Sequence, residues 1–327
     1  MTTSSTFTLI DNSSDAGFRT WGTEFHAQLL ACGLTLTSDT GQINWTTASR
    51  GGSSQTYAGY EIWRFNDTLQ STVPVFLKFE FGVGGTLNSP SIRLTVGSGT
   101  NGAGTMTGFS TIVFCGTNST AGSNPLSTTA FYPSRFCYNA ALGFFGFAWK
   151  IGANGSNSAV DAAYQAAFVF RSSNSAGAAT SDMVMVLSTV GNATVTGSNG
   201  NGILQCLNFA NNTITPPNQT ASVPPGWYWA FHPFMATATI LNGQLAVDPV
   251  FFLGSSSAVG ITPCLARGLK TEIPMQTQVS LTLVGATPHN YLQIGNPLGT
   301  ATQVGTYNGV DAYQTSNANI GLLMLWE

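Results

Sequence analysis

The sequence predicts a mainly β fold, an antiparallel β-sandwich or jelly-roll-like body with one N-terminal amphipathic helix. Three observations predict it. Apolar and polar residues alternate over many short runs, clusters of Gly, Asn, Ser and Pro separate these runs, and apolar residues recur at spacings of three and four in one segment. Alternation is the period of a half-buried strand, and the three-to-four spacing is that of a helix. Short strands divided by turns favour an antiparallel sandwich over alternating βα units.

The helical segment spans about residues 16–32. Ser14 and Asp15 are the N-cap candidates, and Gly33 is the expected stop. Its wide apolar stripe consists of Phe18, Trp21, Phe25 and Leu29. Such a stripe must be buried, either against the body of its own chain or against a neighbouring subunit. We expect both, with at least one aromatic side chain at a subunit contact.

The strands follow in order. Alternation is clearest from Val73 to Phe81 and from Ile92 to Val96, and the aromatic run Tyr60–Phe65 has the same pattern. Further strands are predicted at 109–115, 164–170, 183–190, 203–209, 246–253, 279–284 and 319–326. Two long proline-bearing loops are expected, from Ser119 to Phe131 and from Asn211 to Gly226.

Two parts of the chain are expected. Residues 1–35 form an N-terminal arm and helix, and residues 36–327 form the β-rich body. The second long loop contains two Pro-Pro pairs, so the body can be divided into two lobes with a boundary near 211–226.

The most unusual feature of the composition is its scarcity of charge. Charged residues make up 7% of the chain, against about 25% in a typical soluble domain. Neutral polar surface costs little to desolvate, and depletion of Lys, Glu and Asp is typical of interface cores. We therefore expect a protein that packs as a homo-oligomer or against partners. A secreted β protein with a neutral polar surface is the alternative.

Charge and cysteine content limit the partners and the location. The formal net charge is −3, with ten Lys and Arg spread along the chain, so nucleic acid is not expected as a partner. No apolar stretch approaches the ~18–20 residues of a membrane helix, and no signal peptide is recognised, so we expect neither membrane insertion nor secretion. Five cysteines at wide spacings predict free, mostly buried thiols and no disulfide.

One glycine-rich run has the dinucleotide-binding pattern GxGxxG. It extends from Gly97 to Gly102 and follows a predicted strand. That fingerprint also needs a helix directly after it, because the pyrophosphate binds at the helix N-terminus. The residues that follow do not favour a helix. We therefore expect a strand-to-strand turn and no cofactor.

The chain has three histidines, His26, His232 and His289. None has an acid nearby in the sequence that would orient it, and no Cys/His cluster has zinc-ligand spacing. His26 lies on the predicted helix, where a partly buried structural role is expected.

The carboxylates are mostly isolated. Glu61, Asp67 and Glu80 are candidates for a glycosidase pair, but nothing in the sequence singles them out. We interpret Glu61, Arg64, Lys78 and Glu80 as cross-strand pairs on one sheet. The chain is thus predicted not to be an enzyme, with no catalytic, cofactor-binding or metal site.

An aromatic patch extends from Trp227 to Phe234 and includes Trp227, Tyr228 and Trp229. Exposed aromatics can form a sugar-binding platform. We expect core or subunit-interface packing instead. With the helix stripe, these residues are the predicted interface or binding patch.

Five runs of the sequence carry a resemblance to known proteins. They are Asp39–Trp45, Gly59–Asp67, Pro74–Glu80, Gly285–Leu292 and Leu323–Glu327. They resemble uncharacterised proteins of tailed-phage and prophage structural gene clusters. The resemblance covers residues 18–108 and the C-terminal end, and does not extend to residues 110–270.

The resemblance implies a structural component of the virion, in the tail or baseplate region, assembled in the host cytoplasm. Its implied partners are copies of itself and other virion proteins. The alternatives are a capsid decoration protein, a surface protein that binds a host receptor or glycan, and a virion-borne hydrolase of the cell envelope.

Overall fold

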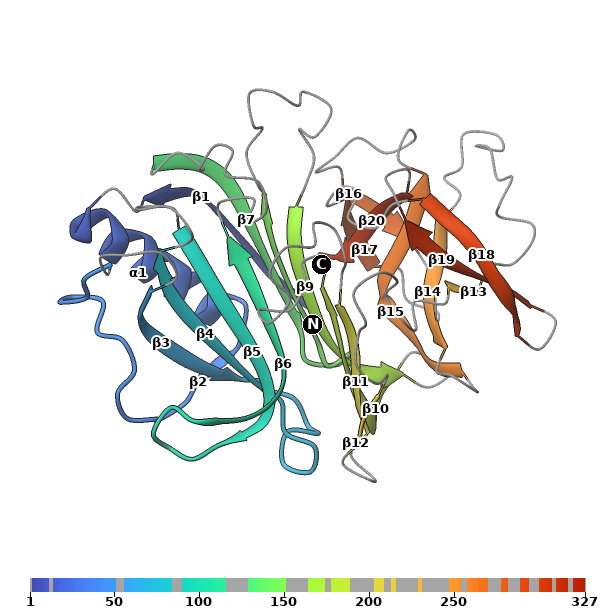
Figure 1. Cartoon of the computed structure of the whole chain (residues 1–327), viewed down its shortest axis with the longest axis horizontal. Helices are drawn as coiled ribbons and strands as arrows, with labels where there is room; N and C mark the ends of the chain where they lie inside the picture. Colours follow the sequence, from blue (N-terminus) through green and yellow to red (C-terminus); the bar gives the residue numbers. More distant parts are fainter. Residues whose placement is uncertain are drawn as a thin grey trace.

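The structure is a computed structural model of the whole chain. It describes residues 2–11, 14–50, 56–83, 90–115, 129–150, 164–173, 178–188, 203–208, 213–215, 229–230, 247–253, 258–269, 278–281, 289–293, 300–307, 310–316 and 320–326. These residues form antiparallel sheets and one helix near the N-terminus, so the predicted mainly β class is confirmed (Figure 1). The choice between sandwich and jelly roll stays a prediction.

The helix α1 spans Asp15–Ala31, within one residue of the predicted range. The Ser14 hydroxyl caps its N-terminus by accepting a hydrogen bond from the Gly17 amide at 3.0 Å. At the other end, Gly33 takes a positive φ of 94°, and the amides of Gly33 and Leu34 donate to the carbonyls of Leu30 and Leu29. This Schellman arrangement satisfies carbonyls that the helix end leaves unpaired.

A five-stranded sheet follows the helix. Its strands run in sequence order and are β2 (Thr35–Leu36), β3 (Thr56–Arg64), β4 (Phe76–Val83), β5 (Pro90–Thr100) and β6 (Met106–Cys115). The predicted alternation is confirmed, because the core-facing residues of β4 and β5 are buried and those between them are partly exposed. β4 starts three residues later than Val73. Pro74, which lies in between, has no N–H for a ladder.

The largest sheet joins both ends of the chain. Its first part is β1 (Thr2–Asp11), β7 (Thr129–Asn139), β8 (Phe144–Lys150), β9 (Tyr164–Ser173), β10 (Ala179–Ser188), β11 (Ile203–Asn208) and β12 (Thr213–Thr215). Its second part is β14 (Val247–Leu253), β15 (Ala258–Leu269), β16 (Gln278–Leu281), β17 (His289–Gln293) and β20 (Ile320–Leu325). A separate three-stranded sheet is formed by β13 (Trp229–Ala230), β18 (Thr300–Tyr307) and β19 (Val310–Ser316).

Several strands were not foreseen, among them β1, β8 and β15. The end of the predicted loop Ser119–Phe131 belongs to β7. Residues 1–35 contribute β1 to the large sheet and α1 to the main core. The predicted lobe boundary at 211–226 lies outside the described residues, apart from Thr213–Thr215.

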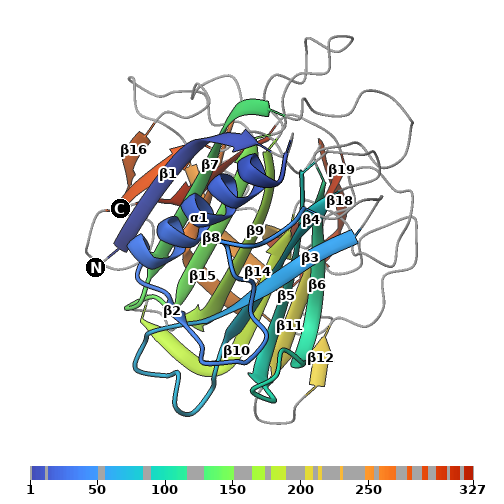
Figure 2. The same cartoon turned by 90° about the vertical axis from the view of Figure 1, so that its left-hand side faces the viewer.

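The main core is formed by α1, the five-stranded sheet and strands β7 to β10. Phe25 of α1 is the clearest link, because its ring contacts Phe79 and Phe81 of β4, Phe136 of β7 and Phe147 of β8 at centroid distances of 4.9 to 5.6 Å. Figure 2 shows α1 in front of β7 and β8, at the side of the five-stranded sheet. Edge-to-face aromatic pairs of this kind contribute about 0.5–1.5 kcal/mol each beyond the burial of apolar area.

The strands β7 to β10 are buried on both faces. Phe145 and Phe147 of β8 face the main core, while Phe144 stacks on Phe168 of β9 away from that core. On this second face β20 is so close that a Cβ at Gly146 would lie 2.6 Å from the Met324 sulfur. In Figure 1 these central strands lie between the N-terminal sheet and the C-terminal strands. Burial on both faces explains why β8 is apolar throughout rather than alternating.

Candidate functional site

A buried carboxylate, Glu61 of β3, organises the most chemically suggestive cluster. Its Oε1 lies 2.7 Å from His26 Nδ1 and accepts from Trp45 Nε1 at 2.7 Å, while Oε2 accepts from Trp63 Nε1 at 3.1 Å. The Glu61 side chain is 3% exposed and that of His26 is 28% exposed. The hydrogen bond that His26 donates to Glu61 raises the pKa of His26 above its ordinary value, against the opposing effect of burial.

This pair resembles the base and orienting acid of a general-base site. The described partners of His26, however, are Glu61 and the ring of Trp63 at 5.1 Å, and both belong to the packing of α1 on β3. The expected structural role of His26 therefore agrees with its contacts. Sequence spacing missed the acid, because Glu61 lies 35 residues away. The sequence did contain a usable indication. Glu61 and Trp63 are two residues apart on one strand, so their side chains lie on the same face, and the inward face of Trp63 implies an inward-facing Glu61.

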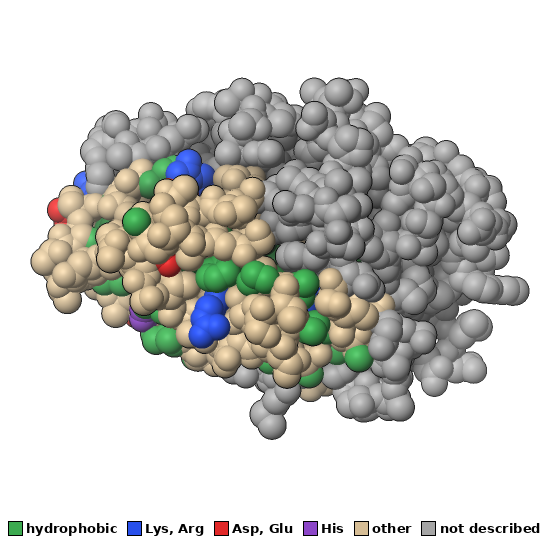
Figure 3. Space-filling view, turned by 90° about the horizontal axis from the view of Figure 1, so that it is seen from below, with side chains coloured by type: hydrophobic (Ala, Val, Ile, Leu, Met, Phe, Trp, Pro, Cys, Tyr) green, Lys and Arg blue, Asp and Glu red, His purple; other side chains and the backbone are tan. Residues whose placement is uncertain are grey.

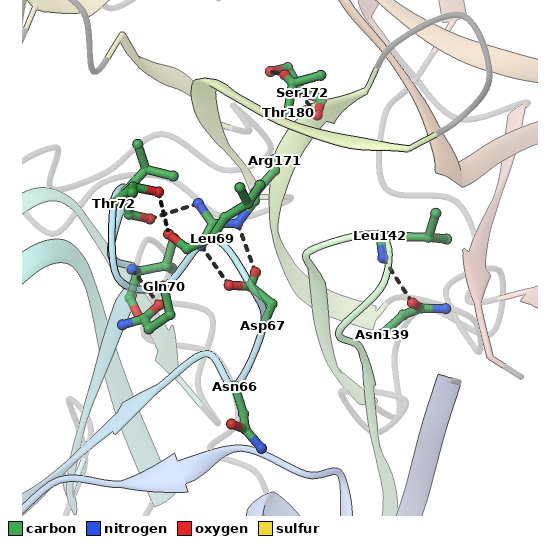
Figure 4. Close-up of polar contacts among 12 residues, drawn as sticks. Asn66, Asp67, Leu69, Gln70, Thr72, Asn139, Leu142, Arg171, Ser172 and Thr180 are labelled. Atoms are coloured by element: carbon green, nitrogen blue, oxygen red, sulfur yellow. Dashed lines mark hydrogen bonds and ion pairs between the residues drawn. The ribbon is translucent and has the colours of Figure 1, made fainter.

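A second buried ion pair joins the two sheets. Arg171 of β9 is 0% exposed and holds Asp67, which follows β3, through two hydrogen bonds of 2.7 and 3.0 Å. Its third donor bonds the Val73 carbonyl at 2.7 Å. Figure 4 shows the arginine reaching from its strand into the loop that contains Asp67 and Gln70. Nearby, the Asn66 amide donates to the Tyr138 hydroxyl at 2.6 Å.

The glycine-rich run ends β5 and opens a turn to β6, so the predicted strand-to-strand turn is confirmed. Asp39 fastens this turn, accepting from the hydroxyls of Thr37 and Thr100 and from the Gly104 amide. Burial would raise the pKa of Asp39, but these hydrogen bonds outweigh it and hold the pKa below its ordinary value. The turn's groups are used within the chain, since the Gly102 carbonyl accepts from Thr40.

The outer face of the same sheet carries a ladder of charges and aromatics. Arg93 of β5 forms a two-point ion pair with Glu80 of β4 and lies over the Tyr57 ring, 4.5 Å from its centroid. Lys78 lies over the Tyr60 ring at 4.4 Å. The cross-strand pairing expected here is confirmed for Glu80, whose cross-strand partner is Arg93, while Lys78 of the same strand lies 3.5 Å from its carboxylate. Glu61 does not belong to this face, because its carboxylate is buried against α1.

The predicted interface residues of the helix are all in the interior of their own chain. Phe18, Trp21, Phe25 and Leu29 are at most 1% exposed. Of the two places considered for the helix, the structure shows the one against its own body. These side chains therefore present no surface to a neighbour in this structure. The exposed large hydrophobic residue of the described surface is Leu30, at 50%.

The other predicted residues are not placed. Trp227, Tyr228 and His232 lie outside the described residues, and the side chains of Trp229 and His289 are not described. Their backbones belong to β13 and β17. Cys32 and Cys137 are buried and form no disulfide.

The described residues include neither a metal-binding cluster nor a membrane-spanning helix. No group of three or more His, Cys, Asp or Glu side chains there is arranged to hold a metal ion. The same residues include no helix long and apolar enough to cross a membrane. Comparison of the chain with family models, curated proteins and solved structures found no match.

Proposed function

We propose that this chain is a structural subunit of a tailed-phage virion, in the tail or baseplate region, and that it acts by packing against copies of itself and other virion proteins. One observation carries the proposal: charged residues make up only 7% of the chain, and several of those that the structure describes are paired within it. Buried or half-buried pairs hold Glu61, Asp67, Glu80, Arg93 and Arg171.

The remaining surface is mostly neutral. In Figure 3 the described part of the face seen from below is largely uncharged, with isolated Lys, Arg, Asp and Glu side chains. A free soluble protein normally keeps apart from its copies by displaying charge. A surface of Ser, Thr, Asn and Gly loses little solvation when another subunit covers it. Packing in an assembly is the function that suits this distribution of charge.

Two further features support the proposal. The five-stranded sheet packs on β8 through Phe79 and Phe147, and α1 packs against both, an arrangement that suits a rigid building block. The runs that resemble phage structural proteins supply part of it. Gly59–Asp67 and Pro74–Glu80 contain most of β3 and most of β4, together with the buried Glu61 and Asp67. The proposed role is therefore a scaffold held by internal ion pairs rather than a catalyst.

The test is to disrupt the gene in the phage or prophage that carries it and to supply an epitope-tagged chain in trans. We expect the tag to co-purify with tailed particles at constant stoichiometry, and antibody to label one location in electron micrographs. Particles of unchanged composition, morphology and infectivity without the chain would overturn the proposal. A tagged chain carrying Arg171→Met, which weakens the junction between sheets, should enter particles less than one carrying Arg93→Met.

A further inference from the structure

The five-stranded sheet has two edges that differ in how they are finished. At one edge the short strand β2 pairs with β3, and the segment Thr37–Ile43 that follows β2 continues alongside β3. The amides of Thr37 and Ile43 donate to the carbonyls of Ile62 and Tyr60 at 2.8 and 2.9 Å. The Gln42 side chain bonds backbone groups that a neighbouring strand would otherwise bond. Its Oε1 accepts from the Ile62 amide at 2.8 Å, and its Nε2 donates to the Thr37 carbonyl at 2.8 Å. This edge is closed.

The opposite edge is β6, Met106–Cys115, and it is long and continuous. Among the described strands its only hydrogen-bonded neighbour is β5. A regular strand alternates the direction of its backbone groups, so one side of β6 bonds β5 and the other side points away from the sheet. An unpaired row of N–H and C=O groups is a template for another strand.

Beyond the bulge at Phe109, β6 lacks the devices that usually protect such an edge. Its sequence, MTGFSTIVFC, contains no Lys, Arg, Asp, Glu or Pro. Irregular register occurs only near the turn, where Phe109 of β6 has no partner and the register shifts again between Gly97 and Gly99 of β5, so Ser110–Cys115 pair regularly with β5. These six residues are uncharged, rich in β-branched types and without Pro, which is the composition that pairs most readily with another strand.

We propose that the edge of β6 opposite β5, which no described strand pairs, associates with β6 of a second copy of this chain in antiparallel orientation about a two-fold axis. The geometry is self-complementary, because a two-fold axis perpendicular to an edge strand presents the same row of donors and acceptors to itself. The absence of charge from the strand lets two copies approach without like-charge repulsion. The pair joins two five-stranded sheets into one continuous sheet. The inference rests on the proposed packing function and names its surface and its partner.

Two lysine variants test the pairing. Thr111 of β6 and Thr95 of β5 are cross-strand partners on the same face, and their hydroxyls lie 3.3 Å apart. Thr111→Lys and Thr95→Lys each remove that contact and add one charge to the face, but only Thr111→Lys places it on the edge strand. By sedimentation velocity of the full chain, we expect wild type and Thr95→Lys to form a dimer as concentration rises. Thr111→Lys should remain monomeric at the same concentrations.

If a variant fails to fold, a measurement on the wild-type chain still tests whether β6 pairs with a second copy. Hydrogen exchange of β6 amides should slow as wild-type concentration rises, while exchange in β4 stays unchanged. A monomer at every concentration, a Thr111→Lys chain that dimerises as well as Thr95→Lys, or β6 exchange independent of concentration would overturn the inference. A chain that is monomeric but still found in virions would contradict the β6 pairing and leave the proposed function standing. A chain that forms the dimer but never enters virions would contradict the proposed function and leave the β6 pairing standing.

Discussion

At the scale of single residues, the stability of this chain depends on a few buried polar groups with fixed partners. Arg171 has three donors bonded to Asp67 and Val73, and Glu61 accepts from one imidazole and two indoles. A buried ion pair brings little net stability, but removal of one partner leaves the other charge uncompensated in the interior. Such groups therefore select one arrangement of the elements that carry them.

The junction at Arg171 gives the first prediction. Arg171→Met should lower the free energy of unfolding by about 3–5 kcal/mol, because Asp67 would stay buried without its partner. Arg93→Met is the matched control. Its ion pair with Glu80 is 35% exposed on the arginine side, so the loss should be about 0–1 kcal/mol. Denaturant unfolding measures both. The double variant Asp67→Leu/Arg171→Met should recover part of the loss, and no recovery would contradict this account of the site.

The His26–Glu61 pair gives a prediction about pH. The pKa of His26 is raised from 6.5 by its hydrogen bond to Glu61, so folding is favoured by protonation of His26. The stabilisation should be fully present below pH 6.5 and should disappear as the pH rises through the higher folded-state value. The stability difference between wild type and His26→Gln, followed by thermal unfolding against pH, should shrink over that window. In Glu61→Gln the same histidine, observed by NMR, should titrate at a lower pH.

At the scale of elements, local signals and close contacts fix the helix and the turns. The cap at Ser14 and the positive φ of Gly33 set the ends of α1. The turn between β5 and β6 has two glycines with positive φ that differ in their surroundings. A Cβ at Gly102 would meet nothing within 4 Å, whereas one at Gly104 would lie 2.2 Å from the Tyr60 hydroxyl oxygen.

These two glycines make a matched pair for a third prediction. Gly102→Ala should cost only the strain of an L residue at positive φ, about 1–2 kcal/mol. Gly104→Ala should cost more, because Tyr60 must also leave its hydrogen bond to the Thr40 carbonyl. Denaturant unfolding of the two variants compares them. Equal losses would show that Tyr60 moves freely and that the turn is not held as the contacts indicate.

At the scale of the whole molecule, the N-terminal segment is part of the interior. α1 supplies four of the buried side chains of the main core, and β1 pairs with β7 along most of its length. Full burial of side chains of this size stabilises by roughly 1.5–3 kcal/mol each. The four together are comparable to the ~5–15 kcal/mol by which a whole domain is stable.

Deletion therefore gives the fourth prediction. A chain that lacks residues 1–34 should not fold, because the core would lose Phe18, Trp21, Phe25 and Leu29. A chain that lacks only residues 1–11 keeps α1 and should fold with reduced stability, since it loses the pairing of β1 with β7. Near-ultraviolet circular dichroism and soluble yield distinguish the two. Native-like spectra from the longer deletion would mean that α1 is an accessory rather than a core element.

The sequence by itself determined the features that depend on near neighbours. The helix ends, the alternating strands β4 and β5 and the turn at Gly97–Gly102 all follow from periodicity, caps and turn residues within a few positions. The GxGxxG pattern at Gly97–Gly102 did not lead to a prediction of dinucleotide binding, because the residues after it do not favour a helix.

The tertiary structure decided what depends on distant partners. Glu61 meets His26 across 35 residues, and Arg171 meets Asp67 across 104. The apolar run of β8 fits a strand or a buried helix equally well by periodicity, and only burial on both faces selected the strand. The apolar stripe of α1 indicated that this face of the helix must be buried, but an apolar surface does not specify which element buries it. Burial is non-directional, so the choice between its own chain and a neighbour was made by the shape of the assembled sheets.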